Sequence, residues 1–227
     1  MDYRIEGGSL PAVILNVRAG ETVISEAGGR TWMRGAVDTE TTSGGGVKKV
    51  FGRLLSGESL FLSRYVARGD AEIGFASSFP GKIIVRELRA GESIICQKRC
   101  FLCGMGDLDF QIHFRKKLGA SFFGGEGFVM QRISGPGIVF LEVDGYAPEY
   151  TLAPGERLVC DTGVLAVMEE TCTMDIQMVS SAKNLFFGGE GLFDTVITGP
   201  GKVYLQTMTV EKLAQLIIPY MPSSNNN

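Results

Sequence analysis

The chain has 227 residues, 44% of them hydrophobic, so it is long enough to bury a sizeable core in one large domain or two small ones. Its net charge of −3 and its pI of about 5.4 argue against a generally basic, nucleic-acid-binding surface. No apolar stretch approaches the roughly 18 residues that a membrane-spanning helix needs.

No secretion signal is visible at the N-terminus, which reads MDYRIEGGSLPAVIL and lacks a basic segment followed by an apolar run and a cleavage site. The five cysteines are an odd number, and without such a signal they indicate reduced thiols. We therefore expect a cytoplasmic protein.

Three repeating units follow one another along the chain, at about residues 10–77, 80–142 and 147–206. Each begins with a β segment and a Gly-Glu turn, at Gly20-Glu21, Gly91-Glu92 and Gly155-Glu156. The second halves of units two and three, residues 119–142 and 183–206, are identical at 12 of 24 positions without a gap. Such repetition predicts a single domain, residues 1–220, whose units share one core.

Short β-branched runs bounded by glycine or proline predict strands, for example PAVILNV, GKIIVREL and KVYLQTM. In the last run Val203 and Leu205 point to one face, and Tyr204 and Gln206 point to the other. The 31 glycines, roughly twice the usual share, favour the tight turns that many short strands need. We predict an all-β fold.

One helix is expected near the C-terminus, at about residues 209–218 in the string TVEKLAQLIIPY. Val210, Leu213 and Ile217 have helical spacing, Thr209 can cap the start and Pro219 ends the helix. We expect this helix to pack on the sheet as a terminal lid, and residues 221–227 to form a disordered tail.

With the RAGE turns, the GGEG turns followed by GPG and the closing helix in view, the chain resembles the bacterial relatives of the Altered Inheritance of Mitochondria protein 24 family. The resemblance covers about residues 4–220. It implies an all-β fold related to the tryptophan RNA-binding attenuator protein, with double-stranded β-helix-like units in a pseudo-threefold arrangement. The mitochondrial members are linked to inner-membrane organisation. No catalytic residue comes with the resemblance, and kinship of fold does not transfer function.

The glycine-rich turns of units two and three are interpreted as structural turns. They comprise Gly124, Gly125, Glu126, Gly127, Gly188, Gly189, Glu190 and Gly191. A phosphate-binding loop would need a Lys-Ser/Thr pair and a following helix, whereas the segments VMQRIS and FDTVIT that follow read as strands.

The segment CQKRCFLC places Cys96, Cys100 and Cys103 at the spacing that radical enzymes using S-adenosylmethionine employ to hold an iron–sulfur cluster. In unit three the positions of Cys100 and Cys103 are taken by Val164 and Val167, and a buried free cysteine behaves as a small hydrophobic residue. We interpret the three cysteines as core residues, with a cluster or a redox-sensitive thiol as the alternatives.

The recurring Glu21, Glu92 and Glu156 are interpreted either as turn residues whose carboxylates accept backbone N–H groups or as rim charges where units meet, because catalytic acids are seldom repeated symmetrically. His113, the single histidine, lies on the polar face of the alternating run DFQIHFRK. A triad would have to use this residue, and a site with several histidine ligands cannot form within one chain. We therefore expect no enzymatic activity, no cofactor and no small-molecule substrate.

Two basic clusters each place three positive charges beside an aromatic residue. Their members are Lys48, Lys49, Arg53, Arg115, Lys116 and Lys117. The simple interpretation is a pair of solvated loops, and the functional one is a patch for RNA or anionic lipid headgroups.

Taken together, these features predict a non-enzymatic scaffold or binding module that forms a homo-oligomer through exposed strand edges. Nucleic-acid or anionic-lipid binding through the basic clusters is the first alternative. An enzyme with a cysteine-based site is the second.

Overall fold

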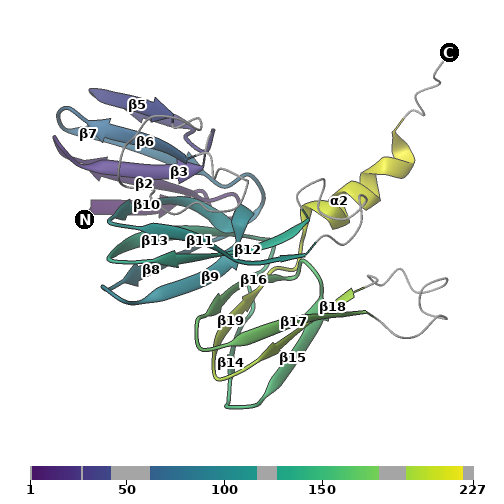
Figure 1. The fold of residues 1–227 in the computed structure, drawn as a ribbon. Coiled ribbons are helices and arrows are strands. Elements are labelled where there is room, and N and C mark those ends of the chain that lie inside the picture. The colour runs from purple at the N-terminus through teal and green to yellow at the C-terminus, as the bar shows by residue number, and fades with distance from the viewer. Residues whose placement is uncertain (1, 27, 42–61, 117–126, 179–192, 222–227) are drawn as a thin grey trace.

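The computed structural model describes residues 2–26, 28–41, 62–116, 127–178 and 193–221 (Figure 1). These ranges contain strands β1 to β19, two short 3-10 helices and a single α-helix near the C-terminus. The prediction of an all-β chain with a short C-terminal helix is therefore confirmed.

The strands fall into three successive stretches that we call unit one, unit two and unit three, preceded by β1 (Asp2–Glu6). Unit one comprises β2 (Ala12–Val17), β3 (Thr22–Glu26), β4 (Trp32–Arg34), β5 (Val37–Thr41), β6 (Leu62–Ala67) and β7 (Ala71–Ala76). Unit two comprises β8 (Gly81–Leu88), β9 (Ser93–Gln97), the 3-10 helix η1 (Lys98–Cys100), β10 (Phe101–Gly106), β11 (Asp109–Lys116), β12 (Phe128–Ser134) and β13 (Gly137–Asp144). Unit three comprises β14 (Glu149–Leu152), β15 (Arg157–Asp161), β16 (Leu165–Glu169), β17 (Thr173–Met178), β18 (Phe193–Thr198) and β19 (Gly201–Leu205).

The same pattern of antiparallel pairing recurs in every unit. The first strand pairs with the sixth, the second and fourth strands pair with the fifth, and the third strand pairs with the sixth. Short turns between strands favour antiparallel neighbours, so equivalent turns in each unit give equivalent pairs.

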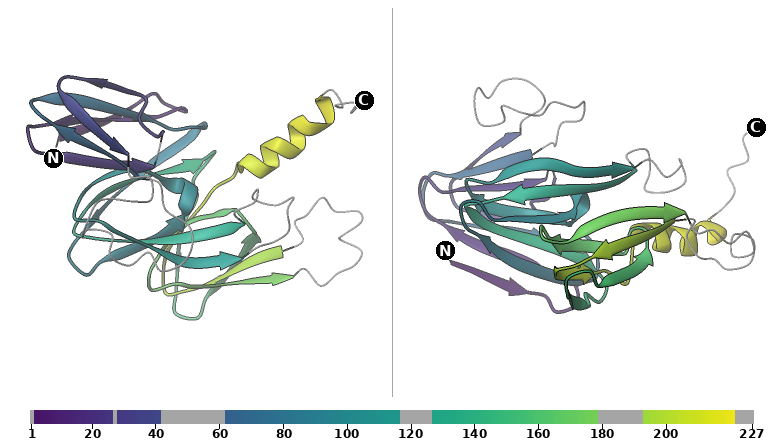
Figure 2. Two further views of the ribbon diagram at one scale, coloured as in Figure 1. Left: turned by 45° about the horizontal axis from the view of Figure 1, so that its top comes forward. Right: turned by 60° about the horizontal axis from the view of Figure 1, so that its bottom comes forward.

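Adjacent units are joined by one further strand pair each. The third strand of a unit pairs with the second strand of the preceding unit, so β10 pairs with β3 and β16 pairs with β9. Two six-stranded sheets result, β5-β6-β3-β10-β13-β8 and β11-β12-β9-β16-β19-β14, and each crosses a boundary between units. Within the described ranges, no strand of a neighbouring unit completes the outer sheets β1-β2-β7-β4 and β15-β18-β17. The units follow one another across the molecule (Figures 1 and 2).

Buried hydrophobic clusters cross the unit boundaries. One cluster contains both Phe75 of unit one and Phe140 of unit two, and another contains both Phe128 of unit two and Ile197 of unit three. The side chains of all four residues are fully or almost fully buried. Apolar burial of this extent is the main stabilising contribution to folding, so adjacent units depend on each other.

The Gly-Glu turns have the predicted structure. The carboxylates of Glu21, Glu92 and Glu156 accept the backbone N–H of the residue three positions earlier, at 2.7, 2.9 and 2.7 Å. The preceding glycines have positive φ angles between 78° and 87°, which is a conformation that residues with a side chain rarely adopt. The turn interpretation of these glutamates is therefore confirmed.

The C-terminal helix α2 (Val210–Ile217) begins as predicted, because the Thr209 hydroxyl accepts the Lys212 N–H at 3.1 Å. The expectation that it packs as a lid is wrong. The helix and the 3-10 turn η3 (Ile218–Tyr220) extend away from the sheets, and Leu216 is 63% exposed (Figures 1 and 2). Only residues of its first turn, such as Leu213, are half-buried, so the axis leaves the body after that turn. No helix in the described ranges has the length and apolar character needed to cross a membrane.

Candidate interaction surfaces

The predicted basic patch is only partly within the described residues, because Lys48, Lys49, Arg53 and Lys117 lie outside them. The other two residues, Arg115 and Lys116, end strand β11. The Lys116 ammonium donates to the carbonyl oxygen of Ile176 on β17 at 2.8 Å, so this lysine links units two and three. The patch itself stays a prediction.

Most of the glycine-rich turn residues also lie outside the described residues. These are Gly124, Gly125, Glu126, Gly188, Gly189, Glu190 and Gly191. Gly127 is described, and its φ of 77° fits a turn that favours glycine.

The three cysteines of CQKRCFLC are buried in two different parts of the core. Cys96 and Cys100 belong to one hydrophobic cluster and Cys103 belongs to another. Burial raises the pKa of the Cys96 thiol to about 12 and holds those of Cys100 and Cys103 well above the usual value, so the thiolate form is disfavoured at neutral pH. Among the described residues, no group of three His, Cys, Asp or Glu side chains is placed to hold a metal ion.

His113 lies on the exposed face of β11, as the alternation predicts, while Phe110 on the opposite face is buried. Partial burial lowers the pKa of His113, with a further contribution from the positive charge of Arg132. At neutral pH the imidazole is therefore neutral.

The most distinctive surfaces are two strand edges at opposite ends of the row of units. Strands β4 and β15 end their sheets, although their equivalents in the other units are paired across a boundary. Met33 on β4 is 38% exposed and Val159 on β15 is 54% exposed, whereas the equivalent strands β10 and β9 are almost entirely buried. Exposed apolar edge strands are templates for pairing with another chain. The sequence suggested exposed edges in general and did not indicate which ones.

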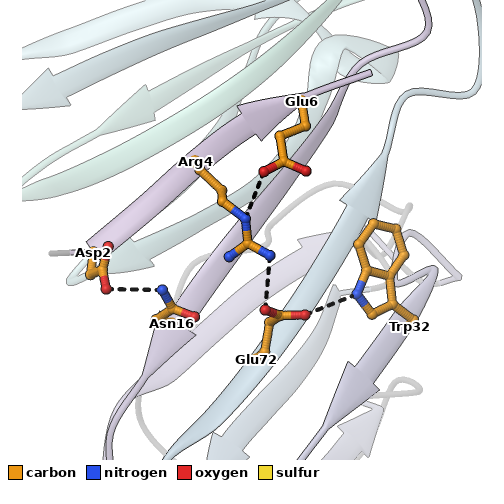
Figure 3. A network of polar contacts seen from close by, with 6 residues as sticks. All are labelled: Asp2, Arg4, Glu6, Asn16, Trp32 and Glu72. Atoms are coloured by element: carbon orange, nitrogen blue, oxygen red, sulfur yellow. Dashed lines mark hydrogen bonds and ion pairs between the residues drawn. The ribbon is translucent and has the colours of Figure 1, made fainter.

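Side-chain contacts of Trp32 hold strand β4 on its sheet (Figure 3). The Trp32 ring lies directly over Gly74 of β7, where an added Cβ would come within 2.1 Å of the indole. The Trp32 indole N–H donates to Glu72 at 3.4 Å, and Glu72 also pairs with Arg4 at 2.9 Å, which in turn contacts Glu6 (Figure 3). A fixed edge loses little conformational freedom when a partner strand binds to it.

A polar pair lies at each boundary between units, and the two pairs differ in charge. At the boundary of units two and three, the Gln97 and Gln206 amides are buried and hydrogen-bonded to each other at 3.3 Å. Repeat positions place Glu26 and Glu142 at the equivalent sites of the first boundary. Burial raises the pKa of Glu142 to about 7, and the negative charges of Asp144 and Glu26 add to that effect.

Comparisons with known proteins agree with the fold. The profile of a family described as mitochondrial biogenesis AIM24 matches residues 3–208. An uncharacterised protein of Streptococcus pyogenes serotype M6, M6_Spy0233, is 27% identical over 225 aligned residues, and the alignment covers 95% of this chain and 89% of that protein. The crystal structure of protein SPYM3_0169 from Streptococcus pyogenes superposes with a TM-score of 0.78 at 23% identity, covering 97% of this chain and 99% of that one.

Proposed function

The chain belongs to the AIM24 family, and from that membership and its two open strand edges we propose that it is a non-enzymatic scaffold built from copies of itself. One observation supports the proposal. The third strand of units two and three pairs with the second strand of the preceding unit, whereas β4, the third strand of unit one, and β15, the second strand of unit three, are at the edges of their sheets. A second copy can supply the strand that each lacks as a neighbour in the described part of the chain. A scaffold also suits a chain whose recurring glutamates staple turns and whose recurring apolar residues fill the core.

The two internal boundaries define the register that such a contact should have. Gly104 on β10 lies opposite Ile24 on β3, and Met168 on β16 lies opposite Ile95 on β9. Ile24 and Ile95 each follow the turn glutamate of their unit by three positions. The residue at this position in unit three is Val159.

The matching residue on the other edge is Met33. It pairs with Ile73 on β7, as Gly104 pairs with Val139 and Met168 pairs with Val203. A copy added in the same register therefore places Met33 opposite Val159. These are the exposed large apolar residues of the two edges, and their contact would remove both from water.

The proposed contact joins two different edges, so it is head-to-tail. Each added copy leaves one β4 edge and one β15 edge free, and growth continues until a ring closes or a filament forms. The particle mass should therefore be a multiple of the chain mass.

Native mass spectrometry and light scattering on the full chain test this proposal. The unaltered protein should be oligomeric at micromolar concentration, and M33E or V159K should each give smaller particles, because a charge then opposes an apolar residue. The double variant M33E/V159K should recover the assembly, because lysine then faces glutamate. Tyr150→Lys, an exposed aromatic replaced on β14, is the matched control and should keep the assembly.

A mixing experiment tests the direction of the contact. M33E retains an intact β15 edge and V159K retains an intact β4 edge, so these two edges should pair in an equimolar mixture. The substituted edges carry opposite charges, as in the double variant, so the mixture should recover the assembly that each variant lacks on its own. A strictly monomeric unaltered protein, or variants that assemble normally on their own, would contradict the proposal.

A further inference from the structure

A groove runs along the boundary between units one and two. Its volume is about 1110 Å³, and its lining includes the Gly-Glu turns of both units and the end of β10. Its apolar lining is formed by Ile24, Leu88, Met105, Leu108 and Ile138, all buried in the core. Arg64 on β6 also lines the groove.

Arg64 brings a polar group into this apolar lining. Its Nε atom is inaccessible to solvent and has no hydrogen-bond partner among the described residues. A buried donor without a partner costs free energy that a ligand can recover by accepting its hydrogen bond. Glu40, which lies opposite Arg64 on β5, is exposed and does not line the groove.

At the second boundary, the equivalent arginine, Arg132, has hydrogen-bond partners for its guanidinium. Arg64 pairs with Ile24 on β3, and Arg132 pairs with the equivalent Ile95 on β9, so the two arginines hold equivalent positions. The Arg132 Nε donates to Ser93 Oγ at 3.1 Å, and its terminal nitrogen forms an ion pair with Glu170. An arginine at this position therefore binds a carboxylate when the chain provides one.

Among the described residues, the first boundary has no carboxylate at the position that Glu170 holds at the second. Met105 pairs with Val23 and Glu169 pairs with Ile94, so Gly106 holds the position equivalent to that of Glu170. Gly106 has a φ of 112°, and a Cβ there would come within 2.6 Å of the Gly137 Cα. Strand packing thus keeps this position free of any side chain, and the groove lies beside it.

We propose that the groove binds a small organic monocarboxylate, whose two oxygens accept from the Arg64 guanidinium the hydrogen bonds that the Ser93 hydroxyl and the Glu170 carboxylate accept from Arg132. The apolar body of the ligand lies along the floor of the groove, and hydrogen bonds between a guanidinium and a carboxylate fix its charged end.

The charges around the groove select this class of ligand. Glu21 and Glu92 already accept backbone N–H groups in their turns. Glu87, Asp107 and Arg89 are exposed at the rim, so the surroundings are acidic overall. Repulsion from these carboxylates grows with the charge of the ligand, so a singly charged carboxylate is favoured over a phosphate.

Calorimetric titration of the full chain tests this site with three probes: hexanoate, octanoate and 4-phenylbutanoate. At least one should bind, and the corresponding primary alcohols and inorganic phosphate should not. Arg64→Met should weaken binding about tenfold or more, because it removes charge-assisted hydrogen bonds. Arg64→Lys should have an intermediate effect, since lysine keeps the charge and loses the planar geometry.

Arg132→Met is the matched control, because it alters the equivalent arginine at the other boundary, and it should leave the affinity for the probe unchanged. Circular dichroism of the Arg64 variants should be that of the unaltered chain, since the Arg64 Nε has no hydrogen-bond partner within the described residues. The proposal is overturned if none of the three carboxylates binds at about 10 mM, if the alcohols bind equally well, if phosphate binds more tightly, or if Arg64→Met binds with unchanged affinity. None of these results depends on whether the chain assembles with itself.

Discussion

Replacement of Glu142 by glutamine should remove a specific pH dependence from the stability of this protein. Glu142 lies on β13 beside a cavity of about 220 Å³, and its carboxylate accepts the Ser78 N–H at 2.8 Å. Charged groups around the same cavity are Glu26, Arg99 and Asp144. At the second boundary an uncharged glutamine, Gln206, holds the equivalent position.

The magnitude follows from the pKa of Glu142. Burial raises it from 4.5 to about 7, so the folded state binds a proton that the unfolded state releases. The stabilisation from this proton is fully present below pH 4.5, and it is lost as the pH rises towards 7. Each pKa unit corresponds to about 1.36 kcal/mol, so the rise from 4.5 to about 7 lowers the free energy of unfolding by about 3 kcal/mol at pH 8.5 relative to pH 4.5.

Urea unfolding, followed by circular dichroism at one fixed protein concentration, measures this effect. E142Q should be more stable than the unaltered chain by about 3 kcal/mol at pH 8.5 and of similar stability at pH 4.5. Gln206→Glu is the reverse change at the other boundary and should introduce a loss of stability that grows with pH. A difference between E142Q and the unaltered chain that is the same at both pH values would refute the reasoning.

Three further measurements probe other parts of the structure. Gly74→Ala should displace the Trp32 ring, lower the free energy of unfolding by about 2 kcal/mol and shift the fluorescence of this single tryptophan. An unchanged emission spectrum would contradict the close contact. Thr209→Ala should weaken the start of α2 by about 1 kcal/mol, seen as faster hydrogen exchange of the Lys212 amide with unchanged global stability, because the helix projects from the body. Thiol labelling at Cys96, Cys100 and Cys103, followed by mass spectrometry, should be slow in the native protein and fast in urea, because all three side chains are buried. Rapid labelling of the native protein would contradict this burial.

An alignment of the repeats could identify some residues of the candidate sites and not others. The alignment of units two and three already places Glu142 opposite Gln206, and it could have drawn attention to this carboxylate. It could not identify Arg64, because its importance depends on the absence of a side chain at Gly106, a residue distant in sequence. The lid expectation for α2 was wrong for a similar reason: an amphipathic pattern shows that a helix has an apolar face and does not show what covers it.

The sequence by itself determined the features that depend on neighbouring residues. The turn glutamates accept N–H groups three positions away, the Thr209 cap acts within one helical turn, and strand alternation follows from the backbone. These interactions need no knowledge of the rest of the fold, so they can be recognised in each repeat.

Only the tertiary structure decided which strands lack a partner and which polar groups remain unsatisfied. Units with the same internal pairing differ in their surroundings, because unit two has a neighbour on both sides while units one and three each have a neighbour on one side. Whether a strand edge or a boundary residue is paired or exposed depends on contacts between residues tens of positions apart. Met33 and Val159 are therefore exposed where their counterparts in the other units are buried. Arg64 faces a groove where its counterpart Arg132 contacts Ser93 and Glu170.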